Sequence, residues 1–232
     1  MKAPVICIDG PAASGKTTVA RALADILGFF YLDTGVLYRA LTWVALQSGI
    51  SPDDAEGLAE LATRTQIEVK PAPQGDPLQT IVLADGDDVS LAIRSPQVDA
   101  NVSEVSAHPE VRAALIGVQR SVAEKGGVIM AGRDAGTVVW PEAEVKIFLV
   151  ASDEERARRR QKQAEIQGIH VDFDTVLAEI RRRDEYDSNR AVAPLRPAPD
   201  AVIIDTTSLS IEEVVDRVLD VVRQRTGMAA GR

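Results

Sequence analysis

The run GPAASGKT at residues 10–17 is the sequence feature that most constrains the fold. It satisfies the pattern GxxxxGK[ST] and follows residues 4–8, which are apolar at consecutive positions, as in a strand buried on both faces of a parallel sheet. From residue 17 to residue 27 apolar side chains recur at helical spacing, and Gly28 is a typical helix stop. A strand, a glycine-rich turn and a helix in this order predict a loop whose backbone N–H groups surround a phosphate.

The chemistry of this loop suits a nucleoside triphosphate. Lys16 would bridge the β- and γ-phosphates of ATP, with a side chain that we expect to pack against nothing, and Thr17 could ligate Mg²⁺. A plain Gly-Lys turn between a strand and a helix is the alternative. The expected ATP-binding residues are Gly10, Pro11, Ala12, Ala13, Ser14, Gly15, Lys16, Thr17 and Thr18. GTPases, motor ATPases and small-molecule kinases all carry such a loop, but the Asn-Lys-x-Asp signature of GTPases is absent here.

Short apolar runs alternate with helical patterns along most of the chain. Strands are expected at residues 29–32, 128–130, 145–150 and 201–204, and a second helix at residues 35–47. This order predicts an α/β fold, a P-loop kinase core of parallel β-sheet with helices on both faces. Between residues 66 and 89 the pattern changes to two β-branched segments, which predict a small inserted antiparallel meander. The PAPQGDP stretch between these segments is expected to be a mobile loop.

Composition excludes several classes of function. The chain has 232 residues and a net charge of −9, so its surface is unsuited to non-specific nucleic-acid binding. Cys7 is the only cysteine and lies in an apolar run, which excludes an internal disulfide and indicates a buried side chain. No apolar stretch is long enough to span a membrane, and no signal peptide is apparent. We therefore expect a cytoplasmic protein without a membrane partner and, in the absence of heptads, a monomer.

The second half of the chain is locally basic. Between Arg156 and Arg196 there are ten basic and seven acidic residues, a net charge of +3. Arg156, Arg159 and Arg160 would share one face of a helix capped by Ser152. Arg183, Asp187 and Arg190 would share one face of a second helix, if that helix persists so far. Two such helices around a connector at residues 167–172 predict a hairpin lid whose guanidinium groups stabilise a transferring phosphoryl group. A solvated face with pairs such as Glu155–Arg159 is the alternative.

Five stretches together resemble the bacterial cytidylate kinases. They are GPAASGKT at 10–17, LDTGVLYR at 32–39, a segment from Ser103 to Arg112, GRDAGTVVWP at 132–141 and RRDEYDSNRAVAPL at 182–195. The resemblance covers nearly the whole chain, and the meander matches the enlarged acceptor-binding part of that class. It implies transfer of the γ-phosphoryl group of ATP to CMP or dCMP with Mg²⁺. Kinases for another small acceptor, such as UMP or shikimate, and a nucleotide-binding regulator without transfer activity are the alternatives.

The resemblance also implies a role for each site residue. The acceptor phosphate would be held by Thr34, Arg39, Arg133 and Arg190, cytosine would be read by Ser103, Arg112 and Asp134, and the ribose would contact Arg183 and Asp187. Lys16, Arg133, Arg159 and Arg190 would act in catalysis, with Arg159 in the lid and also at ATP. Thr34 and Ser103 could instead be helix caps. The acceptor part would span residues 34–104, the lid 156–189, and the core 1–33, 105–155 and 190–226.

Two positions depart from the family pattern. The residue before GRD is often acidic in relatives but is Ala131 here, so a carboxylate near Mg²⁺ must come from elsewhere. Asp33 is the first candidate, with a purely structural role at a strand end as the alternative. Ala13 stands where relatives often have glycine, and we expect a negative φ at this position.

Overall fold

The computed structural model describes residues 2–228 apart from 74–75, 77, 79 and 167. Its strands are β1 (Val5–Asp9), β2 (Phe30–Asp33), β3 (Ile67–Pro71), β4 (Thr80–Ala84), β5 (Asp87–Asp88), β6 (Val128–Gly132), β7 (Val145–Val150) and β8 (Val202–Asp205). Its α-helices are α1 (Lys16–Leu27), α2 (Gly35–Gln47), α3 (Ala55–Arg64), α4 (Pro96–Val105), α5 (Pro109–Ala123), α6 (Asp153–Ile166), α7 (Phe173–Asn189) and α8 (Ile211–Thr226). A 3-10 turn, η1 (Ala92–Arg94), and a π-helical turn, η2 (Ala135–Val139), complete these elements.

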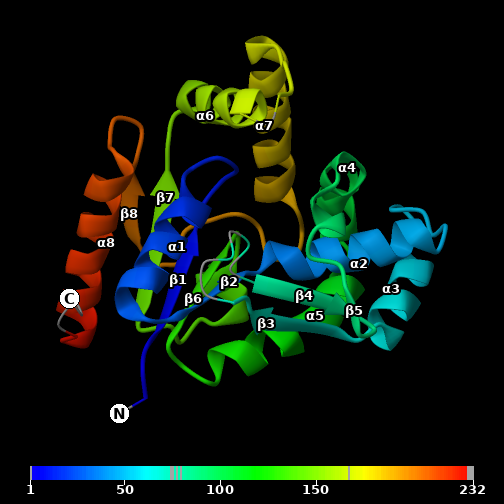
Figure 1. Ribbon diagram of the computed structural model, residues 1–232, viewed down its shortest axis with the longest axis horizontal. Coiled ribbons are helices and arrows are strands. Elements are labelled where there is room, and N and C mark those ends of the chain that lie inside the picture. The colour runs from blue at the N-terminus through cyan, green and yellow to red at the C-terminus, as the bar shows by residue number, and fades with distance from the viewer. Residues whose placement is uncertain (1, 74–75, 77, 79, 167, 229–232) are drawn as a thin grey trace.

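A five-stranded parallel sheet in the order β2-β6-β1-β7-β8 forms the centre of the molecule (Figure 1). This confirms the predicted α/β fold. Because all five strands run the same way, the segments that follow them meet along one edge of the sheet. The glycine-rich loop follows β1, Thr34 follows β2, Arg133 follows β6 and Thr206 follows β8. Segments far apart in the sequence therefore reach one site.

Both faces of β1 are buried, as its continuous apolar run predicts. Ile6 and Ile8 belong to the core formed with α1 and α8, whereas Val5 and Cys7 belong to the core on the opposite face. Cys7 is fully buried, and burial raises the pKa of its thiol well above the usual value. The Cys7 thiol thus packs in the core as a small apolar group, as expected.

The predicted meander is a separate three-stranded antiparallel sheet, β3-β4-β5. It shares a hydrophobic core with α2, α3 and α4, and this core extends into α5 through Val111 and Leu115. Part of the loop expected to be mobile, residues 74–75 and 77, lies outside the described residues.

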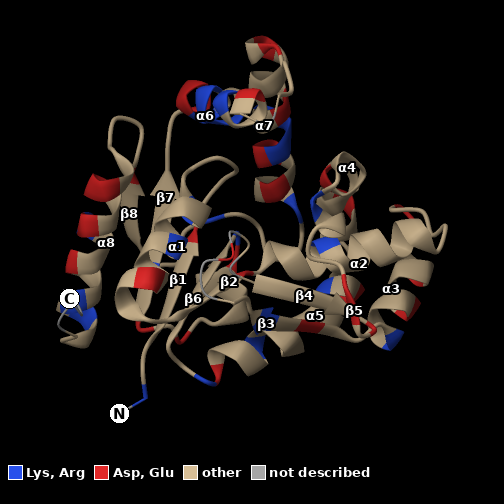
Figure 2. Cartoon of the chain, in the orientation of Figure 1, with Lys and Arg blue, Asp and Glu red and all other residues tan. Residues whose placement is uncertain are grey.

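The predicted helical hairpin is formed by α6 and α7, which stand above the sheet (Figure 1). Ser152 accepts a hydrogen bond from the Glu155 N–H at 3.2 Å, as its expected capping role requires. The hairpin has only a small apolar core around Ala157, Val176 and Ile180. Its surface alternates between acidic and basic groups (Figure 2). A hairpin with so little apolar packing is suited to move as a unit.

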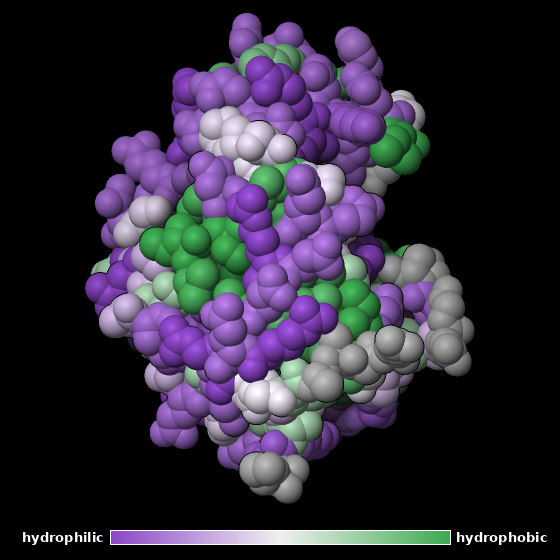
Figure 3. Space-filling view, turned by 90° about the vertical axis from the view of Figure 1, so that its left-hand side faces the viewer, coloured by the Kyte–Doolittle hydropathy of each residue, from purple (hydrophilic) through white to green (hydrophobic). Residues whose placement is uncertain are grey.

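The side of the molecule that carries β8 and α8 combines a hydrophilic hairpin with apolar areas below it (Figure 3). Ile203, on the edge strand β8, and Ile211, at the start of α8, are the exposed apolar residues of these two elements. Among the described residues, no helix combines the length and the apolar character that crossing a membrane would require.

Candidate active site

The loop between β1 and α1 has the backbone geometry of a phosphate cradle. Gly10 has a φ of 150°, and a Cβ at this position would lie 2.2 Å from the carbonyl oxygen of Leu149, so no side chain fits. Gly15 has a φ of 94° and forms the N-cap of α1 without a side-chain hydrogen bond. The first N–H groups of α1 therefore face the loop, where the helix dipole favours an anion. Thr17 and Thr18 lie exposed in the first turn of this helix.

The expectation of a negative φ at Ala13 is wrong. Ala13 has a φ of 58°, in the left-handed region. A loop that turns its N–H groups inward needs a left-handed residue at this point, and alanine adopts that conformation at a cost of about 1–2 kcal/mol. The loop keeps its shape without the glycine that relatives often have there.

Lys16 does not extend freely from the helix, contrary to expectation. Its side chain is buried, and Nζ donates to the Pro11 carbonyl at 2.6 Å and to Ser14 Oγ at 3.5 Å. Burial lowers the pKa of Lys16 well below its usual value, Arg133 adds to this effect, and Asp33 and Asp9 oppose it. The ammonium group thus occupies the loop itself, and a phosphate there would restore its charged form.

Asp9, which the sequence analysis did not single out, fixes the segment after β6. Its carboxylate accepts from the N–H groups of Ala135 and Gly136 at 2.9 and 2.7 Å. Burial raises the pKa of Asp9 to about 6, although the two backbone hydrogen bonds lower it. The sequence did contain a signal for this role, because Asp9 is a carboxylate in an otherwise apolar strand. A buried charge of this kind requires hydrogen-bond or ionic partners.

Asp134 lies directly after β6 and is buried. Arg112 of α5 donates to its Oδ2, and Nη2 of Arg190 lies 3.6 Å from its Oδ1. Arg112 also donates to the Ser106 carbonyl at 3.0 Å and stacks over the Tyr38 ring, 5.0 Å from its centroid. Arg112 and Asp134, both expected to read the base, therefore lie together with Arg190, which was expected to bind the acceptor phosphate.

Arg133 and Arg183 form the second half of this cluster. Arg133 Nε donates to Asp187 Oδ2 at 2.9 Å. Burial and, to a smaller extent, the positive charge of Arg133 together lower the pKa of Arg183 to about 10. Nε of Arg183 and Nη2 of Arg190 are buried without a hydrogen-bond partner in the described part of the chain. Arg183 also lies near the positive charge of Arg133, and Arg190 near that of Arg112. Buried guanidinium donors without a hydrogen-bond partner, placed among other positive charges, indicate a site for an anion.

Arg190 does not extend the face of α7, because the helix ends at Asn189. Arg190 is the C-cap residue, with a ψ of 141°, and its Nε donates to the Ala193 carbonyl at 2.5 Å. This turn leads the guanidinium group back toward Asp134. The sequence analysis placed Arg190 on one helix face with Arg183 and Asp187 only if the helix continued to residue 190, and it does not. Arg190 nevertheless reaches the site.

The alternative role of Thr34 as a helix cap is not borne out by its side chain, and Asp33 contacts the first residue of α2 instead. Thr34 is the N-cap of α2 by position, but its hydroxyl donates to the Ala131 carbonyl at 3.1 Å instead of capping the helix. Asp33 accepts from the Gly35 N–H at 2.9 Å. Asp33 also lies in register with Ala131 across the β2–β6 pair, beside the position that is often acidic in relatives.

Ser103 and Arg39 are the remaining residues that were expected to bind the acceptor. Ser103 is inside α4, so it caps neither end, and among the described residues its side chain makes no hydrogen bond with Arg112 or Asp134. Arg39 of α2 donates to the Ile93 carbonyl at 3.2 Å and pairs with Asp99 of α4. Asp99 was not among the expected residues.

The hairpin reaches the glycine-rich loop through Arg159. Its guanidinium donates to the Thr206 hydroxyl at 3.0 Å and carbonyl at 2.6 Å, and its Nη1 would lie 3.9 Å from a Cβ at Gly15. Nε of Arg159 also donates to Glu155 at 3.0 Å, the pair given as the alternative to a functional role. The Thr206 hydroxyl in turn lies 3.2 Å from the Ser14 carbonyl. Thr206 thus connects the lid to the loop.

Arg156 does not share an exposed face with Arg159 and Arg160. It is almost completely buried and donates to the Ala12 carbonyl at 3.2 Å. It also pairs with Asp153 at 2.6 Å and with Asp184 of α7 at 2.5 Å. Arg156 therefore ties the base of the hairpin to the glycine-rich loop.

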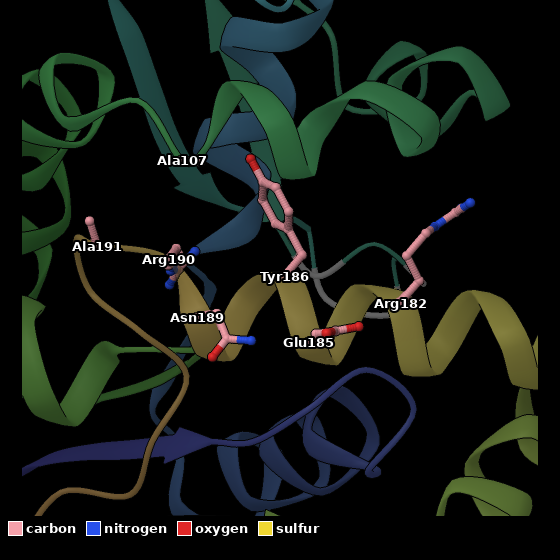
Figure 4. A pocket seen from close by; sticks show the side chains of 7 residues that line it. All are labelled: Ala107, Arg182, Glu185, Tyr186, Asn189, Arg190 and Ala191. Carbon is pink, nitrogen blue, oxygen red and sulfur yellow. The ribbon is translucent and has the colours of Figure 1, made fainter.

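A pocket of about 500 Å³ adjoins the site at the end of α7. Figure 4 shows Tyr186 rising from α7 toward the segment that carries Ala107, while Arg182 points away from the helix and from the other labelled side chains. Arg190 is the one expected site residue in the pocket lining, which contains no residue of the glycine-rich loop. The pocket therefore adjoins one residue expected to hold the acceptor phosphate and none of the loop residues expected to hold ATP.

Comparisons with known proteins agree with this geometry. The chain matches the family profile described as cytidylate kinase over residues 6–224. It is 52% identical over 220 residues to the cytidylate kinase of Anoxybacillus flavithermus, covering 95% of this chain and 96% of that protein. It is 53% identical over 222 residues to the cytidylate kinase of Geobacillus kaustophilus, covering 96% and 97%. An uncharacterized protein from Eubacterium ventriosum shares only the fold, with a TM-score of 0.51 and 14% identity over 96% of this chain and 99% of that chain. The chain belongs to the cytidylate kinase family.

Proposed function

We propose that this chain transfers the γ-phosphoryl group of ATP to CMP or dCMP and releases ADP with CDP or dCDP. The observation that carries the proposal is a cluster of arginines beside a phosphate loop: Arg190 lies beside the buried Asp134, and Arg133 pairs with Asp187 close to Arg183. Guanidinium groups with unpaired donors suit a doubly charged monophosphate. A buried carboxylate among them suits an exocyclic amino group of a base.

On the donor side, residues 10–18 would hold the ATP phosphates and Lys16 would neutralise charge on the transferring group. Arg159, positioned by Thr206 over the loop, would contact the same phosphates from the lid. Together with Arg133 and Arg190 it would stabilise the charge that spreads over the equatorial oxygens in the transition state. The acceptor oxygen is already anionic, so the reaction needs no strong general base, and neither His108 nor His170 is assigned to catalysis.

On the acceptor side, Thr34, Arg39, Arg133 and Arg190 would bind the phosphate, Ser103, Arg112 and Asp134 the cytosine, and Arg183 and Asp187 the ribose. Three of these arginines already pair with aspartates: Arg133 with Asp187, Arg112 with Asp134 and Arg39 with Asp99. Binding of CMP would exchange some of these ion pairs for contacts with the phosphate and the base. The net gain is therefore smaller than the number of new contacts suggests.

Mg²⁺ would be held by Thr17 and the ATP phosphates, with Asp33 contacting its water ligands. Among the described residues, no group of three His, Cys, Asp or Glu side chains could hold a metal. That fits Mg²⁺, which keeps several waters and needs few protein ligands when phosphates are present. The register of Asp33 with Ala131 supplies a carboxylate one strand away from the position that is often acidic in relatives. Bound there, Mg²⁺ would offset the charge on the transferring phosphoryl group.

The parts of the chain would act as expected from the sequence: residues 34–104 as the acceptor part with the meander 66–89, and 156–189 as a lid. The arginines that link the lid to the loop support this division. A monomeric state and a cytoplasmic location remain predictions. Light scattering measures the first and cell fractionation measures the second.

A coupled assay of ADP formation with ATP, Mg²⁺ and one acceptor at a time tests the function. CMP and dCMP should be good acceptors, UMP a poor one, and AMP and shikimate should give only the background rate. Preference for UMP or shikimate would reassign the acceptor. ADP formation that no acceptor stimulates, together with tight ATP binding, would instead support a nucleotide-binding regulator.

A further inference from the structure

Asp99 joins three helices that are far apart in the sequence. It lies in the first turn of α4, where the helix dipole favours a carboxylate. Arg39 of α2 donates to its Oδ1, and Nη2 of Arg160 on α6 donates to its Oδ2 at 3.1 Å. One carboxylate therefore contacts an expected phosphate ligand and the lid at the same time.

The Arg160–Asp99 contact connects two parts of the molecule that otherwise have separate cores. Of the ion pairs that the described residues form, it is the one that joins the hairpin of α6 and α7 to the acceptor part, residues 34–104. Figure 1 shows the hairpin at the top of the molecule and the acceptor part at the right, with α4 as the uppermost element of that part. The side chains of Arg160 and Asp99 are 49% and 30% exposed. So exposed a pair contributes little to the free energy of unfolding, and its role must be sought elsewhere.

The charge of Asp99 is needed because positive groups surround it. Arg39 and Arg160 approach the same carboxylate, and Asp99 also counters the charges near Arg183. Burial alone would raise the pKa of Asp99, but Arg39 and Arg160 outweigh it and hold the pKa below its usual value. A neutral residue here would leave the lid arginine facing Arg39 with repulsion only partly screened by solvent.

We propose that Asp99 is a positioning residue for the acceptor. It holds the guanidinium group of Arg39 at the site, while the second donor of Arg39 is fixed by the Ile93 carbonyl. Through Arg160 it makes lid closure depend on the same carboxylate. Arg160, which the sequence analysis did not place at the acceptor, thereby contributes to CMP binding without contacting CMP. This inference rests on the proposed acceptor site at Arg39.

Steady-state kinetics of Asp99→Asn, Arg160→Gln and the double variant test the proposal. Each single variant should raise KM for CMP by about three- to fivefold, the size expected for a partly exposed ion pair, with KM for ATP unchanged. The double variant should be no worse than Asp99→Asn, because both changes remove one shared interaction. Arg158→Gln is the matched control, because Arg158 lies on the same helix and, within the described part of the chain, forms an ion pair only with Glu155 at 3.3 Å. This variant should leave both KM values unchanged.

A distance measurement between the hairpin and α3 tests the position of the lid directly. A purely local effect on Arg39 would not change this distance. Cysteines introduced at Ile169 in the hairpin and Glu60 in α3, both exposed, carry spin labels, and the buried Cys7 does not react. Asp99→Asn and Arg160→Gln should both lengthen and broaden the label distance. A wild-type distance in both variants, or an Arg160→Gln enzyme with wild-type KM for CMP, would overturn the proposal.

The variant Arg39→Ala separates this inference from the proposed function. If Arg39→Ala raises KM for CMP but Asp99→Asn and Arg160→Gln do not, the acceptor site stands and the role of Asp99 is refuted. If Arg39→Ala leaves KM for CMP unchanged, the acceptor site itself is misassigned.

Discussion

Replacing Asp134 with asparagine should weaken the discrimination between CMP and UMP. Asp134 is buried after β6 and offers only acceptor oxygens, one of which is bonded by Arg112. Such a group suits the N4 amino group of cytosine and opposes the O4 oxygen that uracil has at that place. Asparagine keeps the shape and one acceptor, but adds an NH₂ donor that uracil can use.

The magnitude follows from the burial of the carboxylate. Losing a hydrogen bond to a charged group costs about 1.5–3 kcal/mol, which lowers kcat/KM for CMP about 10- to 150-fold. The reaction with UMP should fall much less, because the carboxylate that repelled O4 is gone. Stability should also fall, but by less than the about 3–5 kcal/mol that follows when a buried ion pair loses one partner outright. The asparagine carbonyl can still accept from Arg112, whereas alanine could not.

The assay is kcat/KM for CMP, dCMP and UMP in the wild-type and variant enzymes, with thermal unfolding of each. CMP and dCMP should lose activity equally, because the change does not affect the sugar. A CMP/UMP ratio that stays at its wild-type value in a folded variant would refute the role of Asp134 in reading the base. The carboxylate would then serve to hold Arg112 and Arg190 in place.

Three further predictions concern other groups of the site. Lys16→Met should reduce turnover by several orders of magnitude and keep the fold, since methionine fills the buried space, as activity and circular dichroism can show. Arg190→Ala should raise KM for CMP about tenfold or more with little change in KM for ATP, because Arg190 lies with Asp134 and away from the loop; equal losses for both substrates would place it elsewhere. The pKa of Asp9 is raised to about 6, so between about pH 4 and pH 6 the folded chain keeps this proton while the unfolded chain releases it. The free energy of unfolding, measured relative to Asp9→Asn, should therefore fall by up to about 3 kcal/mol as pH rises through this window. Urea titrations at several pH values measure this slope, and a flat or rising difference would contradict the assignment.

Local patterns predicted the elements of this fold well. The expected strand at residues 145–150 and helix at residues 35–47 have these same bounds in the structure, and the meander is antiparallel as expected. These segments are specified by apolar periodicity and turn residues, which are local properties of a sequence. The conformation of Ala13 was missed because the loop, and not the residue's own preference, decides its φ.

Contacts between distant polar residues could not be predicted in the same way. Asp9 bonds the N–H of Ala135 126 residues away, Arg39 reaches Asp99 60 residues away, and Arg159 reaches Thr206 47 residues away. No periodicity connects such pairs, and each forms only after the sheet has brought the strand ends together. Family resemblance supplied the residues that would touch substrate, but it gave no information on the residues that hold those side chains in position.

The aspartates of the site explain how an arginine-rich cleft can exist before substrate binds. Arg39, Arg112, Arg133 and Arg156 each pair with a different aspartate, and a buried guanidinium without a counterion would destabilise the fold. An anionic substrate must therefore compete with carboxylates that are already present. With the proposed site residues, an acceptor that brings both a phosphate and an amino group would replace the aspartates at the arginines and also bind Asp134, whereas free phosphate would make only the first exchange. We therefore expect selectivity for a complete nucleotide, because a partial ligand would displace existing ion pairs without replacing all of their hydrogen bonds.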